Sequence, residues 1–182
     1  TIAAAAIAAL AHLGDERGLP ATLAHARSRH VEVRLAVAQA IPWVGGRPLH
    51  PDARQALLGL MADPADEVRD WATFGLGVLT DDDGDDVRDA LLAHLHDPGA
   101  NTAGEALVGL ARRGDRRIVE QLLVELAGPD VGNLTIEAAC ELGDPALLPA
   151  LEHLARTGWA ERDARGDLLV AAIAACGGRP AP

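Results

Sequence analysis

The stretch LGDERGLP at residues 13–20 returns in altered form as RGDRRIVE at 113–120 and LGDPALLP at 142–149. In each copy an apolar segment precedes the glycine and another follows the aspartate. Glycine is the usual residue just beyond a helix C-terminus, and aspartate is a preferred N-cap. Each copy therefore predicts that one helix ends and the next begins within about two residues.

A second pair of landmarks lies between these turns. Asp-Pro closes an apolar segment at residues 63–64 and 97–98, and Val-Arg lies near the start of the next helix at residues 33–34 and 68–69. Together the landmarks predict a unit of helix A, a tight turn and helix B, with about 29 to 35 residues per unit. The predicted A helices cover residues 18–29, 52–62, 86–96, 116–127 and 145–156. The predicted B helices cover residues 31–41, 67–78, 101–112, 133–142 and 165–176.

This pattern resembles the HEAT-repeat family, in particular the short bacterial HEAT-like repeats of the phycobilisome-lyase type. The resemblance implies an all-α, right-handed α-α superhelix of about five helical hairpins, with B helices on the concave side. This sequence departs from the family pattern at Ala103 and Thr135, which replace the helix-B arginine. It also departs at Pro42, which we expect to end or kink its helix near Ala40.

The expected organisation is a single array over residues 1–176 with a flexible tail at 177–182. Residues 2–13 read as a helix B whose helix A is missing, within an orphan segment 1–14. We expect the apolar face of this helix to be exposed, or covered through self-association or by a longer natural N-terminus. The repeats are placed near residues 15–45, 50–79, 84–113, 115–142 and 144–176.

Composition narrows the classes of function. The 182 residues carry a formal charge of −11, and all 16 basic residues are arginine. This acidity disfavours binding to nucleic acid or to an anionic membrane surface. No apolar run reaches the roughly 20 residues that span a bilayer. Two cysteines give no disulfide framework, so we expect a reduced, cytoplasmic protein.

One row of residues on the B helices suggests a binding surface. When these helices are aligned on their terminal Leu-Gly, Trp71 falls in register with Ala36, Glu105 and Glu137. A row that holds two glutamates is unlike a buried seam, so we expect it to face the concave surface. The predicted acidic ridge with an aromatic centre consists of Asp70, Trp71, Phe74, Glu105 and Glu137.

The alternative is that Trp71 and Phe74 lie in the core. Tryptophan is highly buried on average, so Trp71 could lie across a neighbouring helix as peripheral core. The row of Phe74 also contains Val108 and Cys140, which favours the core for Phe74.

The leading functional hypothesis is a non-catalytic protein-protein interaction or scaffold module that holds a basic or amphipathic segment of a protein partner. A rival is a HEAT-like DNA glycosylase for alkylated bases. By resemblance, such enzymes use an aspartate and tryptophans on the concave face, and Asp70, Trp71 and Trp43 could superficially imitate these residues. Such enzymes need a basic groove, which fits an acidic chain badly. A chromophore-lyase-type subunit is a second rival, by resemblance alone.

Metal and cofactor sites are not expected. The acid run TDDDGDD at residues 80–86 fails the EF-hand spacing and reads as an acidic turn that caps the next helix. His94 and His96 do not share a helix face, and no third ligand is evident. We therefore predict no catalytic, cofactor-binding or metal-binding residues.

Overall fold

The computed structural model describes residues 1–159 and 166–177, and these contain helices and turns but no strand. This confirms the predicted all-α class. The chain divides into two compact units, residues 1–106 and residues 107–182, and the single array stays a prediction. Five residues of the expected tail, 178–182, lie outside the described part of the chain.

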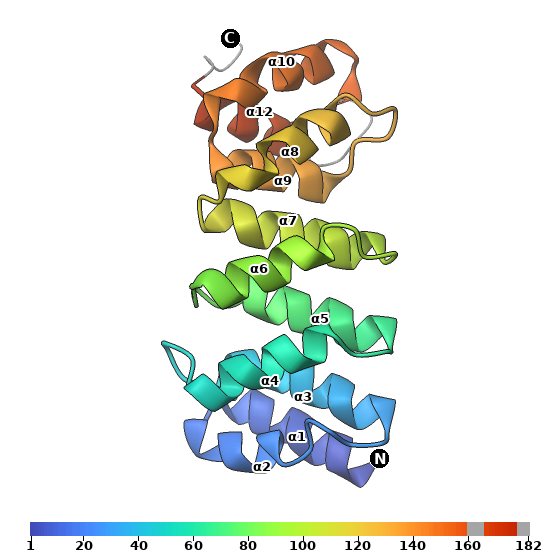
Figure 1. Cartoon of the computed structure of the whole chain (residues 1–182), viewed down its shortest axis with the longest axis vertical. Helices are drawn as coiled ribbons and strands as arrows, with labels where there is room; N and C mark the ends of the chain where they lie inside the picture. Colours follow the sequence, from blue (N-terminus) through green and yellow to red (C-terminus); the bar gives the residue numbers. More distant parts are fainter. Residues whose placement is uncertain (160–165, 178–182) are drawn as a thin grey trace. The chain divides into compact units, whose positions relative to one another are not determined.

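The first unit contains two kinds of helix-to-helix packing. The helix α1 packs against α3, and α3 packs against α5, so that successive B helices lie side by side (Figure 1). The A helix α4 packs against α5 within the same hairpin. The helices are α1 (Ile2–Leu13), α2 (Leu19–Leu23), α3 (Val31–Val44), α4 (Pro51–Met61), α5 (Asp66–Gly77) and α6 (Asp85–His94), followed by the first half of α7 (Ala100–Arg112).

The second unit begins within α7 and repeats the same packing. Here α8 packs against α9, and α9 packs against α12. Its fully buried side chains include Leu122, Ile136 and Leu151, one from each of α8, α9 and α10. The remaining helices are α8 (Val119–Leu126), α9 (Asn133–Leu142), α10 (Leu148–Arg156) and α12 (Gly166–Ala175).

The Gly-Asp turns have the predicted geometry. The three glycines adopt left-handed backbone angles, with φ of 62°, 63° and 59° at Gly14, Gly114 and Gly143. The aspartate that follows each glycine accepts a hydrogen bond from the backbone N–H two residues later, over 2.9 to 3.1 Å. Each aspartate opens a short 3-10 turn (Glu16–Gly18, Arg116–Ile118 and Pro145–Leu147) that leads into α2, α8 or α10.

The first A helix is shorter than predicted. We expected a helix over residues 18–29, but α2 ends at Leu23. Beyond it, His25 N–H donates to the Thr22 carbonyl and Ala26 N–H donates to the Leu23 carbonyl. These i→i−3 hydrogen bonds replace the α-helical pattern and tighten the chain into turns.

Pro42 does not end its helix near Ala40, because α3 continues to Val44, and a kink at this proline stays a prediction. Pro42 is buried, and α5 places Gly75 against it. A Cβ built on Gly75 would lie 3.0 Å from Pro42 Cγ and 3.7 Å from the Ala38 carbonyl oxygen. Proline removes the N–H that would bond this carbonyl. The close approach of α5 at a glycine therefore gives the ring a packed environment in which the helix is retained.

No helix in the described residues is both long and apolar enough to cross a membrane.

Candidate functional site

Pairs of arginine and aspartate hold the N-terminal ends of two B helices, α3 and α5. Arg34 on α3 binds Asp63 through two hydrogen bonds, Nε to Oδ2 at 2.6 Å and Nη2 to Oδ1 at 2.8 Å. Arg69 on α5 binds Asp97 in the same way, at 2.9 and 3.2 Å. The arginine side chains hold the pKa of both carboxyls below its usual range. The Val-Arg and Asp-Pro landmarks are thus two halves of one contact between successive repeats.

Sequence reasoning missed this pairing. The signal was present, because the two arginines precede their aspartates by similar separations of 29 and 28 residues. At the next equivalent position Ala103 has no charge to offer, so the Arg–Asp contact is not repeated there.

The anchored helix α5 carries a continuous surface stripe. Glu67, Asp70, Trp71 and Phe74 follow the spacing i, i+3, i+4 and i+7, which places them on one helix face. Trp71 is 37% exposed, whereas Phe74 is half-buried. Their rings meet edge to face, with centroids 5.7 Å apart and an interplanar angle of 79°. Trp71 therefore lies at the surface, and Phe74 supports it from the side.

Trp43 adds a second exposed indole in the first unit. It is 51% exposed and lies near the C-terminal end of α3. Trp43 follows Ala36, the register equivalent of Trp71, by seven residues, or about two helical turns. It therefore belongs to the face of α3 that corresponds to the Trp71 face of α5. The predicted ridge did not include this residue.

Asp70 lies in a groove between the N-terminal ends of α5 and α7. The groove is shallow and widely open to solvent, with a volume of about 470 Å³. The Thr102 hydroxyl lies 3.4 Å from Asp70 Oδ1, at the long end of hydrogen-bond distance. Burial raises the pKa of Asp70, repulsion from Asp97 raises it further, and the Thr102 contact opposes both. The residues that line the groove are Asp66, Glu67, Asp70, Gly99, Ala100, Asn101 and Thr102.

The structure brings only part of the predicted ridge together. Asp70, Trp71 and Phe74 share one face of α5. Glu105 is half-buried on α7 in the same unit, whereas Glu137 is half-buried on α9 in the second unit. The participation of Glu137 in a common ridge stays a prediction.

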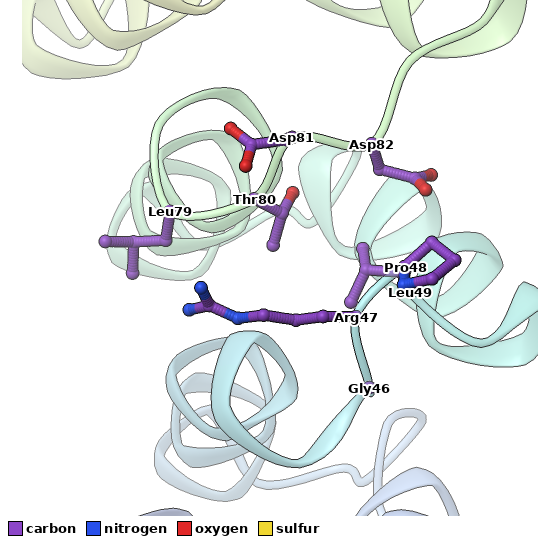
Figure 2. Close-up of a pocket in the computed structure, with 8 residues that line it drawn as sticks. All are labelled: Gly46, Arg47, Pro48, Leu49, Leu79, Thr80, Asp81 and Asp82. Carbon is purple, nitrogen blue, oxygen red and sulfur yellow. The ribbon is translucent and has the colours of Figure 1, made fainter.

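A second cavity lies between two turns of the first unit. It has a volume of about 250 Å³ and is lined by residues 46–49 and 79–82. Figure 2 shows the Arg47 side chain along one wall, with its guanidinium toward Leu79 and Thr80, and the Asp82 carboxylate turned away from it. Asp82 lies 3.3 Å from Arg54 as an ion pair. The lining contains no histidine, cysteine or serine, so it offers no nucleophile paired with a histidine base.

The acid run at residues 80–86 forms the turn that precedes α6. Asp85 and Asp86 occupy the first turn of this helix. Asp82 and Asp86 pair with Arg54, and Asp83 pairs with Arg88 at 2.7 Å. Asp82, Asp83 and Asp86 are therefore paired with arginines rather than gathered around one point.

The described residues also contain no group of three or more His, Cys, Asp or Glu side chains that could hold a metal ion. His94 instead lies between two backbone carbonyls, with Nδ1 2.8 Å from Ala90 O and Nε2 2.7 Å from Met61 O. Both thiols are free, and burial raises the pKa of Cys140 and of Cys176. Raised thiol pKa values disfavour the reactive thiolate form.

Comparisons with known proteins agree with the all-α repeat fold. Residues 1–77 match a family model described as HEAT repeats. Protein YibA of Escherichia coli strain K12 is 36% identical over 126 residues, which cover 69% of this chain and 43% of YibA. Protein YibA of strain O157:H7 matches with the same figures. The X-ray structure of Escherichia coli YibA superposes with a TM-score of 0.71 at 30% identity, covering 87% of this chain and 54% of that one. The chain thus spans about half the length of the relatives it matches.

Proposed function

We propose that this chain, a HEAT-repeat protein related to Escherichia coli YibA, acts as a non-catalytic module that binds another protein. The observation that carries the proposal is the Trp71 stripe. A large indole is left 37% exposed on a helix that has a packed core on its other side. Exposed aromatic side chains at the centre of a surface are frequent anchors of protein interfaces.

The chemistry around Trp71 favours a basic or amphipathic partner. The same face of α5 carries Glu67 and Asp70 one turn before the aromatic pair, and Trp43 supplies further apolar area on α3. Carboxylates beside an apolar anchor would steer a cationic partner and fix its orientation. A segment with basic and apolar residues on one side matches this surface.

The same carboxylates weigh against the glycosylase alternative. Duplex DNA binds proteins through contacts between phosphates and basic side chains. The α5 face presents acids where such an enzyme needs cations, although Asp70, Trp71 and Trp43 are all present in the first unit. We therefore propose no duplex DNA binding at physiological salt. The described residues give no specific support to the chromophore-lyase alternative.

The test is the Trp71→Ala variant, measured against a partner purified from the native host. We expect the dissociation constant to rise about 30-fold or more, because hot-spot truncations cost about 2 kcal/mol or more. The melting temperature should change little, because Trp71 already lies partly in water. Val124→Ala is the matched control, since Val124 is 70% exposed and belongs to the second unit.

Equal partner affinity for Trp71→Ala and Val124→Ala would contradict the proposal. A large fall in the melting temperature of Trp71→Ala would show instead that the indole is part of the core.

A further inference from the structure

The carboxylates near the start of α5 are not equally matched by arginines. Arg34 is bound to Asp63, and Arg69 is bound to both Asp66 and Asp97. Glu67 and Asp70 also line the groove at this place. Within residues 1–159 and 166–177, no basic side chain pairs with either of them, and the sequence contains no lysine.

Asp70 is the more costly of the two to leave without a cation. Its side chain is half-buried, and the negatively charged Asp97 lies close enough to repel it. The Thr102 hydroxyl offers one long contact in compensation. A carboxylate that is partly removed from water favours an incoming positive charge.

The neighbouring indole would add to this preference. Trp71 follows Asp70 directly on α5 and is partly exposed. A lysine or arginine head group within about 6 Å of an indole face is attracted by the ring. Groove and indole together therefore present a carboxylate and an aromatic surface to the same incoming group.

We infer that the groove between the N-terminal ends of α5 and α7 receives one lysine or arginine side chain of the protein partner. This inference rests on the proposed function and assigns the chemistry of one subsite. An apolar residue of the same partner segment then packs on Trp71 and Phe74. Glu67 and Phe74 are seven residues apart, or about 10 Å along the helix. The cationic and apolar residues of the partner are separated by a similar distance, about three residues of extended chain.

The probe is N-acetyl-argininamide, and its neutral analogue N-acetyl-citrullinamide is the control ligand. Nitrogen-15 NMR of the full chain follows the amides of Glu67, Asp70 and Asn101 and the indole N–H of Trp71. We expect saturable shifts of these signals with the arginine probe and none with the citrulline probe.

A charge-matched pair of double variants separates a local site from the general field of an acidic protein. Glu67→Gln with Asp70→Asn should raise the dissociation constant of the arginine probe at least fivefold. Glu120→Gln with Glu152→Gln removes two exposed charges from the second unit and should change it less than twofold. Equal weakening by both pairs, or equal shifts with the citrulline probe, would overturn the inference.

Protein stability and partner affinity complete the test. Asp70→Asn should keep or raise the melting temperature, because it removes a partly desolvated charge, whereas a purely structural Asp70 would lower it when replaced. If Trp71→Ala abolishes partner binding while Glu67→Gln with Asp70→Asn leaves the affinity and its salt dependence unchanged, the cation subsite is wrong and the proposed function stands. If the arginine probe binds as expected and Trp71→Ala leaves partner affinity unchanged, the subsite is supported and the proposed function is wrong.

Discussion

At the scale of single residues, the aspartates of the first unit differ in whether an arginine side chain donates hydrogen bonds to them. Asp63 and Asp97 each receive two hydrogen bonds from an arginine, and their pKa values are lowered. Among residues 1–159 and 166–177 no arginine donates to Asp70, and burial raises the pKa of this carboxyl. A carboxylate that an arginine matches contributes to stability, whereas a half-buried carboxylate without one is available to a ligand.

The contribution of the Arg–Asp contact can be measured at Arg34. The side chains of Arg34 and Asp63 are 13% and 6% exposed. Arg34→Ala would leave the Asp63 carboxylate largely buried without its cation, so we expect a loss of about 3 kcal/mol in the free energy of unfolding. Urea denaturation followed by circular dichroism measures this loss.

Arg27→Ala is the matched control, because Arg27 is exposed and belongs to the same unit. Its effect should stay within about 0.5 kcal/mol. Similar losses for Arg27→Ala and Arg34→Ala would show that the Asp63 pair contributes little.

At the scale of elements, the contact between α3 and α5 depends on one glycine. Gly75 lets the backbone of α5 approach the Pro42 ring and the Ala38 carbonyl that proline leaves without its usual donor. The two residues act together, because a helix with an interior proline needs a neighbour shaped to accept it. This explains why α3 and α5 are both intact although each carries a residue unfavourable to helices.

Substitution of Gly75 by alanine should therefore destabilise the protein. The added Cβ would lie 3.0 Å from Pro42 Cγ in a buried contact. Overpacking costs typically about 1 to 3 kcal/mol, and the better helix propensity of alanine offsets part of it. We expect a net loss of about 1 kcal/mol in the free energy of unfolding, measured by chemical denaturation.

Gly59→Ala is the control, and we expect it to change the free energy of unfolding in the opposite direction. Gly59 lies on the exposed side of α4, and a Cβ there would meet nothing within 4 Å. The same change should stabilise the protein by about 0.5 to 1 kcal/mol. A gain of stability at both glycines would remove the role assigned to the Gly75–Pro42 contact.

At the scale of the whole molecule, the chain is acidic, but its first helix is almost uncharged and largely apolar. From the net charge of −11 we expect weak binding to phosphate backbones and anionic surfaces and a preference for cationic partners. The helix α1, in contrast, has no acidic or basic residue except His12 and buries only Ile7. A helix that is apolar on all sides is usually covered on all sides.

We therefore expect self-association through α1. Ile2 and Leu13 are 91% and 75% exposed, and the alanines between them would allow another helix to approach closely. Sedimentation equilibrium should show a mass that rises with protein concentration. Ile2→Ser with Leu13→Ser should lower this association. A single monomeric species over a wide concentration range would contradict the prediction.

The sequence by itself determined the turns at which one helix ends and the next begins. A glycine that ends a helix and an aspartate that begins the next act on backbone groups two or three residues away, so Gly14-Asp15 and Gly143-Asp144 could be interpreted without a structure. The C-terminal ends of α1 at Leu13 and of α9 at Leu142 agree with the predicted ranges for this reason. The alignment of the B helices favours a surface position for Trp71 but does not exclude a core position, because register alone does not say which neighbour covers a side chain.

Only the tertiary structure decided what depends on residues far apart in the chain. Arg34 meets Asp63 across 29 residues, and Pro42 is accommodated by Gly75 on another helix. Arg69 is bound to Asp66 and Asp97, so that within the described residues no arginine pairs with Asp70, and this too depends on the tertiary structure. Local hydrogen bonds are encoded by neighbours in sequence, whereas packing and charge pairing are encoded by neighbours in space. The fold of this chain could therefore be predicted from its turns and the α5 part of the candidate surface from its register, whereas the Arg–Asp pairs that set Asp70 apart could not be predicted.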